Sequence, residues 1–243
     1  MAVRAVITGA AGGLGQAIVR EFLRRGCTVF AIDIDNSRLA DLKRGAETPG
    51  NLVTLRADVT SETECAEAVQ TVSAHGGVDV LVNNAGMITR SSTADTTLEQ
   101  WNRVLEVNLT GAFLMTRTAL PVMQQSQRPR IINVASRAAV RPHKNAAPSY
   151  GASKAALVYL TRHWAMEYSD RGILCFCVSP GPVRTPMFDR LDAEYRKRIE
   201  SEMVTGQAIE SDEVARLIWY AASECGPSMT GQTFACNAGT SWG

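Results

Sequence analysis

The sequence predicts one α/β domain built on a doubly wound parallel sheet with helices on both faces. Short apolar runs alternate with longer helical stretches along the whole chain, and several of these runs are almost entirely Val, Ile and Leu. Such runs are typical of parallel strands that helices cover on both sides. No linker, repeat or low-complexity segment divides the 243 residues, so we expect a single domain over 1–243.

The predicted elements follow this alternation from the N-terminus. Strands are expected at 4–8, 28–33, 52–57, 78–83, 130–135, 173–179 and 232–237, and helices at 13–25, 61–74, 98–125, 149–169 and 211–223. Right-handed crossovers then place successive strands parallel to one another. The stretch of about 181–207, which includes a charged helical patch at 191–202, predicts a loop over a substrate, although a surface insertion without a role is the alternative.

The composition argues against several partners. The formal net charge is +1, which gives no long-range attraction to nucleic acid or to an anionic membrane surface. The chain shows neither a signal-peptide pattern nor about 18 uninterrupted apolar residues, so we expect a cytoplasmic protein without a membrane partner. The six cysteines are scattered, which favours reduced thiols over disulfides. The three histidines show no metal-ligand spacing, and we expect no metal.

A glycine-rich turn follows the first predicted strand. Glycines between a strand and a helix let the backbone approach a pyrophosphate, and the free N–H groups of the helix favour an anion there. A turn of this kind is a weak signal alone, but the strand before it and the amphipathic helix after it strengthen the interpretation. The turn reads Thr8-Gly9-Ala10-Ala11-Gly12-Gly13-Leu14-Gly15.

The second predicted strand ends in Asp33. A carboxylate at this place can accept hydrogen bonds from both ribose hydroxyls of NAD and would repel the 2′-phosphate of NADP. We therefore expect NAD as the cofactor. Arg38 is a reservation because its long side chain could fold back toward a phosphate, and Asp33 as an ordinary helix-capping acid is the alternative.

Tyr150 and Lys154 lie four residues apart at the start of a predicted helix, on the same face. A lysine about 4–5 Å from a phenol at an effective dielectric near 20 favours the phenolate by roughly 3–4 kcal/mol. This predicts a pKa lowered by about 2–3 units, before desolvation takes some of the lowering back. Such a tyrosine can exchange a proton with an alcohol or a carbonyl while hydride moves to or from a nicotinamide. The spacing alone is common in helices.

Further polar and glycine positions follow neighbouring strands. Ser136 ends the fifth strand, where its hydroxyl could polarise a substrate oxygen. Asn84 and Gly86 follow the fourth strand, and Gly181 follows the sixth. The carboxyl ends of parallel strands share one edge of a sheet, which is where open α/β sheets bind ligands.

Four separated motifs together resemble the short-chain dehydrogenase/reductase family, whose roughly 250-residue form has this Rossmann-type fold. They are Thr8-Gly9-x3-Gly13-x-Gly15, Asn83-Asn84-Ala85-Gly86, Tyr150-x3-Lys154 and Pro180-Gly181. The resemblance covers nearly the whole chain and implies an oxidoreductase acting on a small alcohol or ketone. It also implies a homodimer or homotetramer packed through helices 98–125 and 149–169.

The resemblance assigns roles to individual residues. Asn108 corresponds to the family's helix asparagine, which holds a water that links the lysine to solvent, and Ser136, Tyr150 and Lys154 match its other catalytic positions. It implies cofactor contacts at Gly9, Gly13, Leu14, Gly15, Asp33, Asp58, Val59, Asn84, Ala85, Gly86, Tyr150, Lys154, Pro180, Gly181, Val183 and Thr185. Two departures are an interval from Ser136 to Tyr150 that is one residue longer than usual, and Asn237-Ala238 in place of Asp-Gly.

Basic residues gather among those expected to border the substrate. We expect contacts from Arg90, Arg137, Arg141, His143 and Met187, and one or two of the basic side chains are predicted to bind an anionic group such as a carboxylate. The alternative is that most of them face solvent or a neighbouring subunit. Two other functions share this fold: an NAD-using lyase or epimerase, and a non-catalytic dinucleotide sensor.

Overall fold

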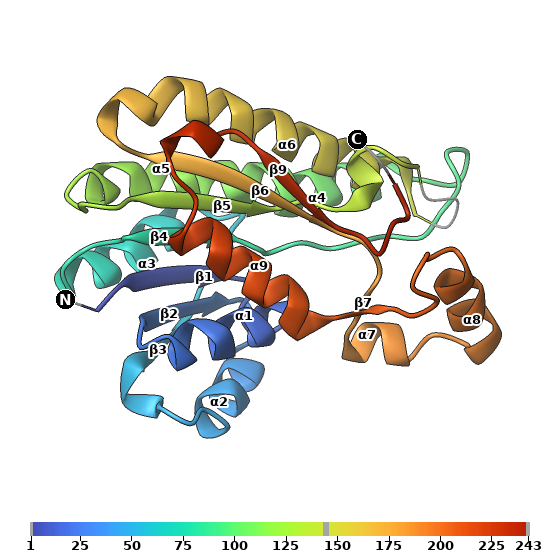
Figure 1. Cartoon of the computed structure of the whole chain (residues 1–243), viewed down its shortest axis with the longest axis horizontal. Helices are drawn as coiled ribbons and strands as arrows, with labels where there is room; N and C mark the ends of the chain where they lie inside the picture. Colours follow the sequence, from blue (N-terminus) through green and yellow to red (C-terminus); the bar gives the residue numbers. More distant parts are fainter. Residues whose placement is uncertain (1, 143–145, 242–243) are drawn as a thin grey trace.

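The computed structural model describes residues 2–142 and 146–241. Seven parallel strands form one sheet in the order β3-β2-β1-β4-β5-β6-β9, and the short strands β7 and β8 pair separately (Figure 1). The order reverses direction at β1 and β4, which makes the sheet doubly wound as predicted. The strands are β1 Arg4–Thr8, β2 Thr28–Asp33, β3 Leu52–Arg56, β4 Val80–Asn83, β5 Arg130–Val134, β6 Leu174–Pro180, β7 Val183–Arg184, β8 Ile209–Glu210 and β9 Thr233–Cys236.

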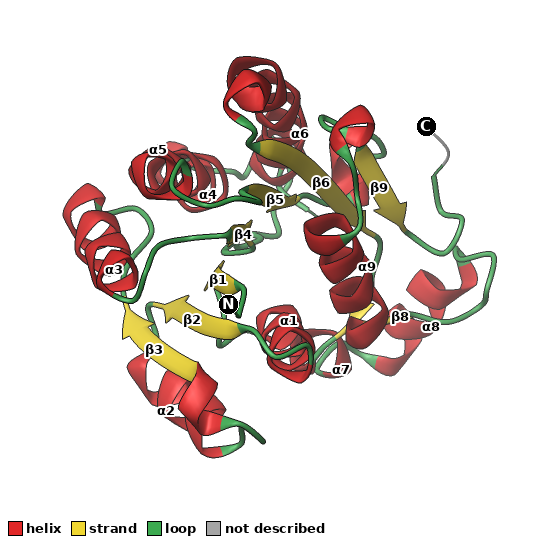
Figure 2. Cartoon of the chain, turned by 60° about the vertical axis from the view of Figure 1, so that its left-hand side comes forward, coloured by secondary structure: helices red, strands yellow, loops and turns green. Residues whose placement is uncertain are grey.

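Helices cover both faces of the sheet (Figure 2). One apolar core joins the sheet to α1, α2 and α9, and a second core joins its other face to α3, α5 and α6. The helices are α1 Gly13–Arg24, α2 Asn36–Arg44, α3 Glu62–Ala74, α4 Leu98–Leu105, α5 Gly111–Met123, α6 Pro148–Tyr168, α7 Pro186–Asp189, α8 Ala193–Ser201 and α9 Ser211–Ser223. Short 3-10 turns lie at Pro49–Asn51, Arg137–Ala139, Ser169–Arg171 and Pro227–Met229.

The strand registers bring the carboxyl ends of four neighbouring strands to one edge. Ile7 of β1 aligns with Val82 of β4, and Asn83 of β4 aligns with Asn133 of β5. Val134 of β5 in turn aligns with Val178 of β6. The glycine-rich turn and the segments that begin at residues 84, 135 and 181 therefore leave the sheet at the same edge, as the sequence predicted.

Two helical features differ from the prediction. Helix α2 was not predicted, because its polar sequence buries only Leu39 and Leu42, while Asp35 caps it by accepting from the backbone N–H of Arg38. The helix expected at 98–125 is interrupted by a π-helical turn at Glu106–Thr110, between α4 and α5. Turns of this kind occur often at functional sites.

The segment after β6 folds back on itself. Val183 pairs with Ile209 and Arg184 with Glu210, so β7 and β8 close its base. Between them, α7 and α8 enclose a small apolar core made of Phe188, Ile199, Met203 and Ala208. The charged helical patch expected at 191–202 is thus α8, which lies beside the carboxyl edge of the sheet (Figure 1).

Among the described residues, no helix is long and apolar enough to cross a membrane. The six cysteines carry free thiols, and five of them are buried. The same part of the chain contains no group of three or more His, Cys, Asp or Glu residues placed to hold a metal ion.

Candidate active site

The glycine-rich turn is packed too tightly for larger residues. Gly9 has a φ of +62°, and a Cβ placed on Gly15 would lie 2.0 Å from the carbonyl oxygen of Gly9. A Cβ on Gly13 would lie 2.8 Å from Cβ of Thr185. No side chain of these glycines therefore covers the backbone of the turn toward the space in front of it, as binding of a pyrophosphate requires.

Asn84 and Thr8 lock the turn to the neighbouring strand. Nδ2 of Asn84 donates to the carbonyl oxygens of Thr8 and Gly9, at 3.0 and 3.1 Å. Oγ1 of Thr8 accepts from the backbone N–H groups of Asn84 and Ala85, both at 3.1 Å. The structural role of Thr8 was missed, since a threonine at the end of a strand carries no special signal in the sequence.

A cleft of about 980 Å³ opens in front of the turn. Its walls come from the ends of β1, β2, β3 and β4 and from α7, so its length follows the carboxyl edge of the sheet. Eleven of the predicted cofactor contacts line it: Gly9, Gly13, Leu14, Gly15, Asp33, Asp58, Val59, Asn84, Ala85, Gly86 and Thr185.

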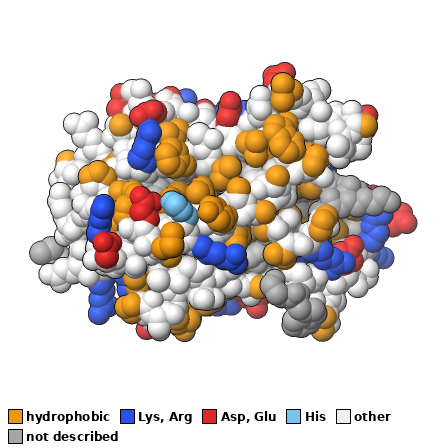
Figure 3. Space-filling view, turned by 90° about the horizontal axis from the view of Figure 1, so that it is seen from above, with side chains coloured by type: hydrophobic (Ala, Val, Ile, Leu, Met, Phe, Trp, Pro, Cys, Tyr) orange, Lys and Arg blue, Asp and Glu red, His pale blue; other side chains and the backbone are white. Residues whose placement is uncertain are grey.

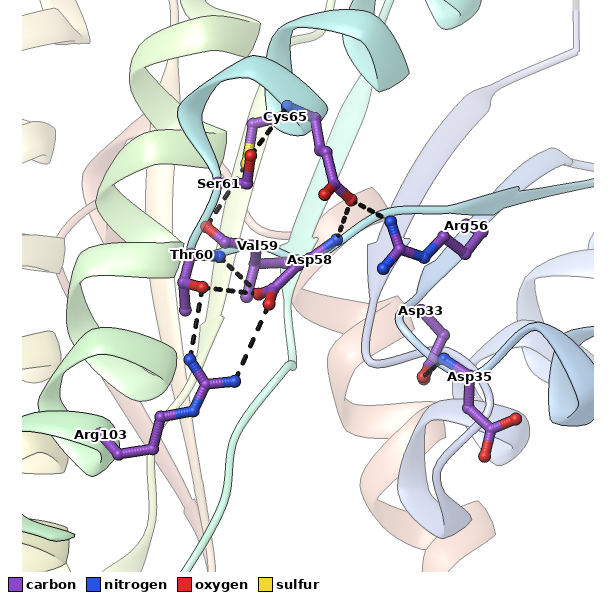
Figure 4. Close-up of polar contacts among 10 residues, drawn as sticks. Asp33, Asp35, Arg56, Asp58, Val59, Thr60, Ser61, Cys65 and Arg103 are labelled. Carbon is purple, nitrogen blue, oxygen red and sulfur yellow. Dashed lines mark hydrogen bonds and ion pairs between the residues drawn. The ribbon is translucent and has the colours of Figure 1, made fainter. Parts of the chain in front are cut away.

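Asp33 is held in place at the end of β2 (Figure 4). Its Oδ2 accepts from the backbone N–H of Ala11 at 2.9 Å, and its Oδ1 accepts from that of Asp35 at 3.0 Å. Arg38 also lines the cleft, but its Nε pairs with Asp35 at 3.3 Å. The carboxylate at the end of β2 is therefore fixed toward the cleft, while the nearby arginine is paired within its own helix.

Asp58 lines the cleft just after β3, and Arg103 of α4 approaches it (Figure 4). Its Oδ1 accepts from the backbone N–H and the hydroxyl of Thr60, at 2.9 and 2.8 Å, and Nη2 of Arg103 lies 3.8 Å from Oδ2. Burial raises the pKa of Asp58, but these hydrogen bonds and the nearby arginines outweigh it and lower the pKa below its usual value. The carboxylate is ionised at neutral pH.

Lys154 lies beneath the cleft. It is buried, and its Nζ donates to the carbonyl oxygen of Val134 at 2.9 Å. A Cβ on Gly86 would lie 3.3 Å from this Nζ, so the glycine forms the wall between the lysine and the cleft. Burial lowers the pKa of Lys154 to about 8. With a pKa of about 8, the Lys154 side chain is still mostly protonated at neutral pH.

Tyr150 is partly buried one helical turn before Lys154. Burial raises the pKa of its phenol above the ordinary value, and a side-chain hydrogen bond with Ser136 opposes this. The net shift of this pKa is therefore upward, opposite to the predicted lowering. The ammonium group of Lys154 is directed to Val134, and its own charge is disfavoured by burial.

Asn108 lies in the π-helical turn and forms hydrogen bonds with the segment after β4. Its Oδ1 accepts from the backbone N–H of Met87 at 2.7 Å, while its Nδ2 donates to the Met87 carbonyl at 2.9 Å and to Oγ of Ser153 at 3.1 Å. A Cβ on Gly86 would lie 3.4 Å from Oδ1. Asn108 and Lys154 thus meet on the same side of Gly86, and Asn108 is paired with backbone groups.

A smaller pocket of about 210 Å³ adjoins the cleft and shares Ile88, Arg90, Thr185 and Leu191 with it. Ser136, Tyr150, Gly181 and Val183 lie in its wall, together with two of the predicted substrate residues, Arg90 and Arg137. Apolar residues of the β7–β8 segment complete it. Among these, Leu191, Tyr195 and Ile199 were not expected individually, although their 191–202 patch was.

Other predicted site residues lie elsewhere. Nη1 of Arg141 donates to the carbonyl oxygen of Thr240 at 2.5 Å, and Arg141 lines neither the cleft nor the pocket. Pro180 is buried as the last residue of β6 and lines neither. His143 falls outside the described residues. Met187 is the second residue of α7.

Known proteins resemble this chain over almost all of its length. The profile of a family described as enoyl-(acyl carrier protein) reductase matches residues 9–241. A 3-oxoacyl-(acyl-carrier-protein) reductase of Thermotoga maritima is 34% identical over 236 residues, which is 96% of each chain. A 3-alpha-(or 20-beta)-hydroxysteroid dehydrogenase of Mycobacterium bovis is 34% identical over 237 residues, covering 97% of this chain and 88% of that one.

A solved structure has the same fold. The 3-oxoacyl-(acyl-carrier protein) reductase of Brucella melitensis superposes with a TM-score of 0.93 at 27% identity and covers 99% of this chain and 92% of its own. Fold, cleft and relatives agree with the four motifs of the sequence. The chain belongs to the short-chain dehydrogenase/reductase family, and as an oxidoreductase of that family it binds a nicotinamide dinucleotide.

Proposed function

We propose that this protein is an NAD-dependent oxidoreductase that interconverts a small alcohol and its ketone. The observation that carries the proposal is that Tyr150 and Ser136 line the smaller pocket, which shares part of its wall with the dinucleotide cleft. The names of the two relatives include a carbonyl reductase and a hydroxyl dehydrogenase, which agree in the type of bond changed and differ in the substrate.

The residues of this chain divide the proton chemistry between them. Ser136 orients the substrate oxygen by a hydrogen bond. The phenol of Tyr150 gives its proton to the carbonyl during reduction, and the phenolate of Tyr150 takes the hydroxyl proton during oxidation. A nicotinamide bound in the cleft supplies the acceptor or the donor of the hydride. The raised pKa of Tyr150 suits proton donation to a carbonyl.

Lys154 and Asn108 act behind Tyr150. The ammonium group of Lys154, buried beside Gly86, places a positive charge close to the cleft and favours the phenolate that forms when Tyr150 gives up its proton. Asn108 fixes Met87 and so holds the wall of the cleft. A water between Asn108 and Lys154 would complete a path for protons to solvent.

The preference for NAD rests on Asp33. Its carboxylate is anchored by the backbone of Ala11 and Asp35 and lines the cleft where β2 ends. A fixed negative charge there accepts hydrogen bonds from ribose hydroxyls and repels a 2′-phosphate. Arg38 pairs with Asp35, which supports the same preference.

We also propose that the protein forms a homodimer or homotetramer through α4, α5 and α6. The face over α6 carries several hydrophobic side chains among the charged ones (Figure 3). Phe113 on α5 and Tyr159 and Met166 on α6 are exposed. Large apolar side chains grouped on a surface are typical of subunit contacts.

The function is tested by measuring cofactor binding and turnover with the purified protein. NADH is expected to bind at least tenfold more tightly than NADPH, and a panel of sugar alcohols, hydroxy acids, steroids and aryl alcohols is expected to yield at least one substrate that forms NADH stoichiometrically. Tight NADH binding without net oxidation or reduction of any member would favour the lyase, epimerase or sensor functions. Failure to bind either dinucleotide would contradict the proposal altogether.

A further inference from the structure

Arg137 is a buried cation that the proposed chemistry does not use. It directly follows Ser136 in the 3-10 turn Arg137–Ala139, lies in the wall of the smaller pocket and is only 6% exposed. Its Nη1 is buried and has no hydrogen-bond partner among the residues that the structure describes. Burial of an unsatisfied donor on a charged group is costly, so a guanidinium nitrogen in this state at a pocket wall points to an acceptor that comes with a ligand.

The protein compensates only part of this charge. Nη2 of Arg137 lies 3.5 Å from Oε2 of Glu202, and the same carboxylate oxygen lies 3.9 Å from Nη2 of Arg141. Two arginines share one glutamate, which leaves this group with one formal positive charge. Glu202 contacts the Nη2 side of Arg137, and Nη1 remains available for a second anion.

The rest of the pocket is lined by neutral or positive side chains. Arg90 also lines the pocket, with its guanidinium 5.7 Å from the ring centre of Tyr195. No Asp or Glu is among the described residues that line the pocket. Val183, Phe188 and Ile199 supply apolar surface. A pocket of about 210 Å³ with this lining fits a small organic anion with a short hydrocarbon body.

We propose that Arg137 binds the carboxylate of a hydroxy acid or oxo acid substrate through Nη1, with Arg90, which lines the same pocket, adding positive charge. The inference rests on the proposed function and names its substrate class. During oxidation the hydroxyl-bearing carbon loses hydride to the nicotinamide, and the hydroxyl proton passes to Oη of Tyr150. The carboxylate stays unchanged and serves to orient the substrate, because a charge-assisted contact is both strong and directional.

The first test needs only the unaltered protein. Short straight-chain hydroxy acids that differ in the position of the hydroxyl group are compared with their methyl esters as substrates. The acid with the best-placed hydroxyl is expected to exceed its ester in kcat/KM by about 10- to 100-fold, as is usual for hydrogen bonds to charged groups. Equal kcat/KM for every acid and its ester would overturn the proposal.

A matched pair of variants distinguishes a direct contact between Arg137 and the carboxylate from an effect of the overall positive charge nearby. Arg137 and Arg141 both approach Glu202, but only Arg137 lines the pocket. Arg137→Met is expected to remove the preference for the acid, chiefly by raising KM, whereas Arg141→Met is expected to keep the ratio of the unaltered protein. Equal loss in both variants would show that the overall charge near Glu202 sets the preference, and would refute a direct contact.

Thermal denaturation gives a readout that does not depend on turnover. Butanoate is expected to raise the Tm of the unaltered protein and of Arg141→Met more than butanamide does, and the difference should vanish in Arg137→Met. A rise with inorganic phosphate equal to that with butanoate, without preferred turnover of acids, would overturn the carboxylate assignment. If Arg137→Met does not fold, Arg137→Lys replaces it; the lysine keeps the charge, lacks the planar fork and is expected to retain only part of the preference.

The two proposals fail in different ways. Oxidation of alcohols with no preference for acids over esters would refute the carboxylate contact and leave the dehydrogenase function intact. A butanoate-dependent rise in Tm without turnover of any alcohol would refute the function and leave an anion site.

Discussion

Lys154 donates a hydrogen bond from Nζ to the carbonyl oxygen of Val134 at the end of β5, 2.9 Å away, and this buried contact fixes the lysine beside the cleft. Burial of the charged ammonium group destabilises the folded state, because it lowers the pKa of Lys154 from 10.5 to about 8. The folded protein therefore binds fewer protons than the unfolded chain between about pH 8 and 10.5, and its stability rises with pH across that window.

Lys154→Met is consequently expected to abolish activity and to stabilise the fold. The shift corresponds to up to about 3 kcal/mol at neutral pH, reduced by the lost hydrogen bond, and the gain should disappear above about pH 10. Urea denaturation at neutral pH and near pH 10 measures it, with Lys43→Met on the exposed face of α2 as the control, where we expect almost no change. A less stable Lys154→Met variant at neutral pH would contradict the prediction.

Tyr150→Phe removes the proposed proton carrier and keeps the ring. We expect kcat to fall by about 10²- to 10⁴-fold, because general acid and base catalysis contributes on this scale, while NADH binding stays within about threefold. Tyr159→Phe, on an exposed part of the same helix, is the control and should behave like the unaltered protein. Near-normal turnover in Tyr150→Phe with Lys154 intact would exclude the mechanism.

The glycine-rich turn yields a prediction on stability alone. Gly15→Ala would place a methyl group 2.0 Å from the Gly9 carbonyl oxygen, so we expect a loss of about 3 kcal/mol in the free energy of unfolding. At Gly12 the nearest atom is 3.4 Å from an added Cβ and φ is −73°, so Gly12→Ala should change stability by less than about 1 kcal/mol. Chemical denaturation compares the two, and equal losses would mean that the turn is not tightly packed at residue 15.

Asp33→Asn tests cofactor choice. The variant keeps the size of the side chain, removes its charge and retains one acceptor for the two backbone N–H groups that Asp33 binds. The ratio of Kd for NADPH to Kd for NADH is expected to fall at least tenfold. A tenfold change corresponds to about 1.4 kcal/mol of binding free energy. Asp41→Asn, whose carboxylate pairs with Arg44 away from the cleft, should leave the ratio unchanged. An unchanged ratio in Asp33→Asn would assign the preference elsewhere.

The sequence predicted the sheet and its ligand-binding edge because both depend on local apolar runs and on the handedness of crossovers. It did not predict α2, whose stability depends on a cap at Asp35 and on two buried leucines rather than on a continuous apolar face. The π-helical turn around Asn108 was also missed, since a single wide turn does not disturb hydrophobic periodicity enough to be recognised.

Side-chain direction limited the prediction of the site. The positions of Asp33, Asn84 and Ser136 follow from strand ends, and the structure places them along the cleft or the pocket. Arg137 and Arg141 look alike in sequence, yet one enters the pocket and the other binds the carbonyl of Thr240. The pKa of Tyr150 was misjudged because burial raises it, and spacing along a helix does not show how deeply a side chain is buried.

The pairing of β7 with β8 makes the segment between these two strands a separable module. Two residue pairs, Val183 with Ile209 and Arg184 with Glu210, tie its ends together, and the residues between them carry their own small core. Changing the length of a closed loop costs little, because the entropy of closure grows only with the logarithm of loop length. Evolution, or a designer who exchanges the residues after Leu191 and before Ile209, can therefore alter the lining of the smaller pocket while the cofactor turn, Thr185, Tyr150 and Lys154 keep their places.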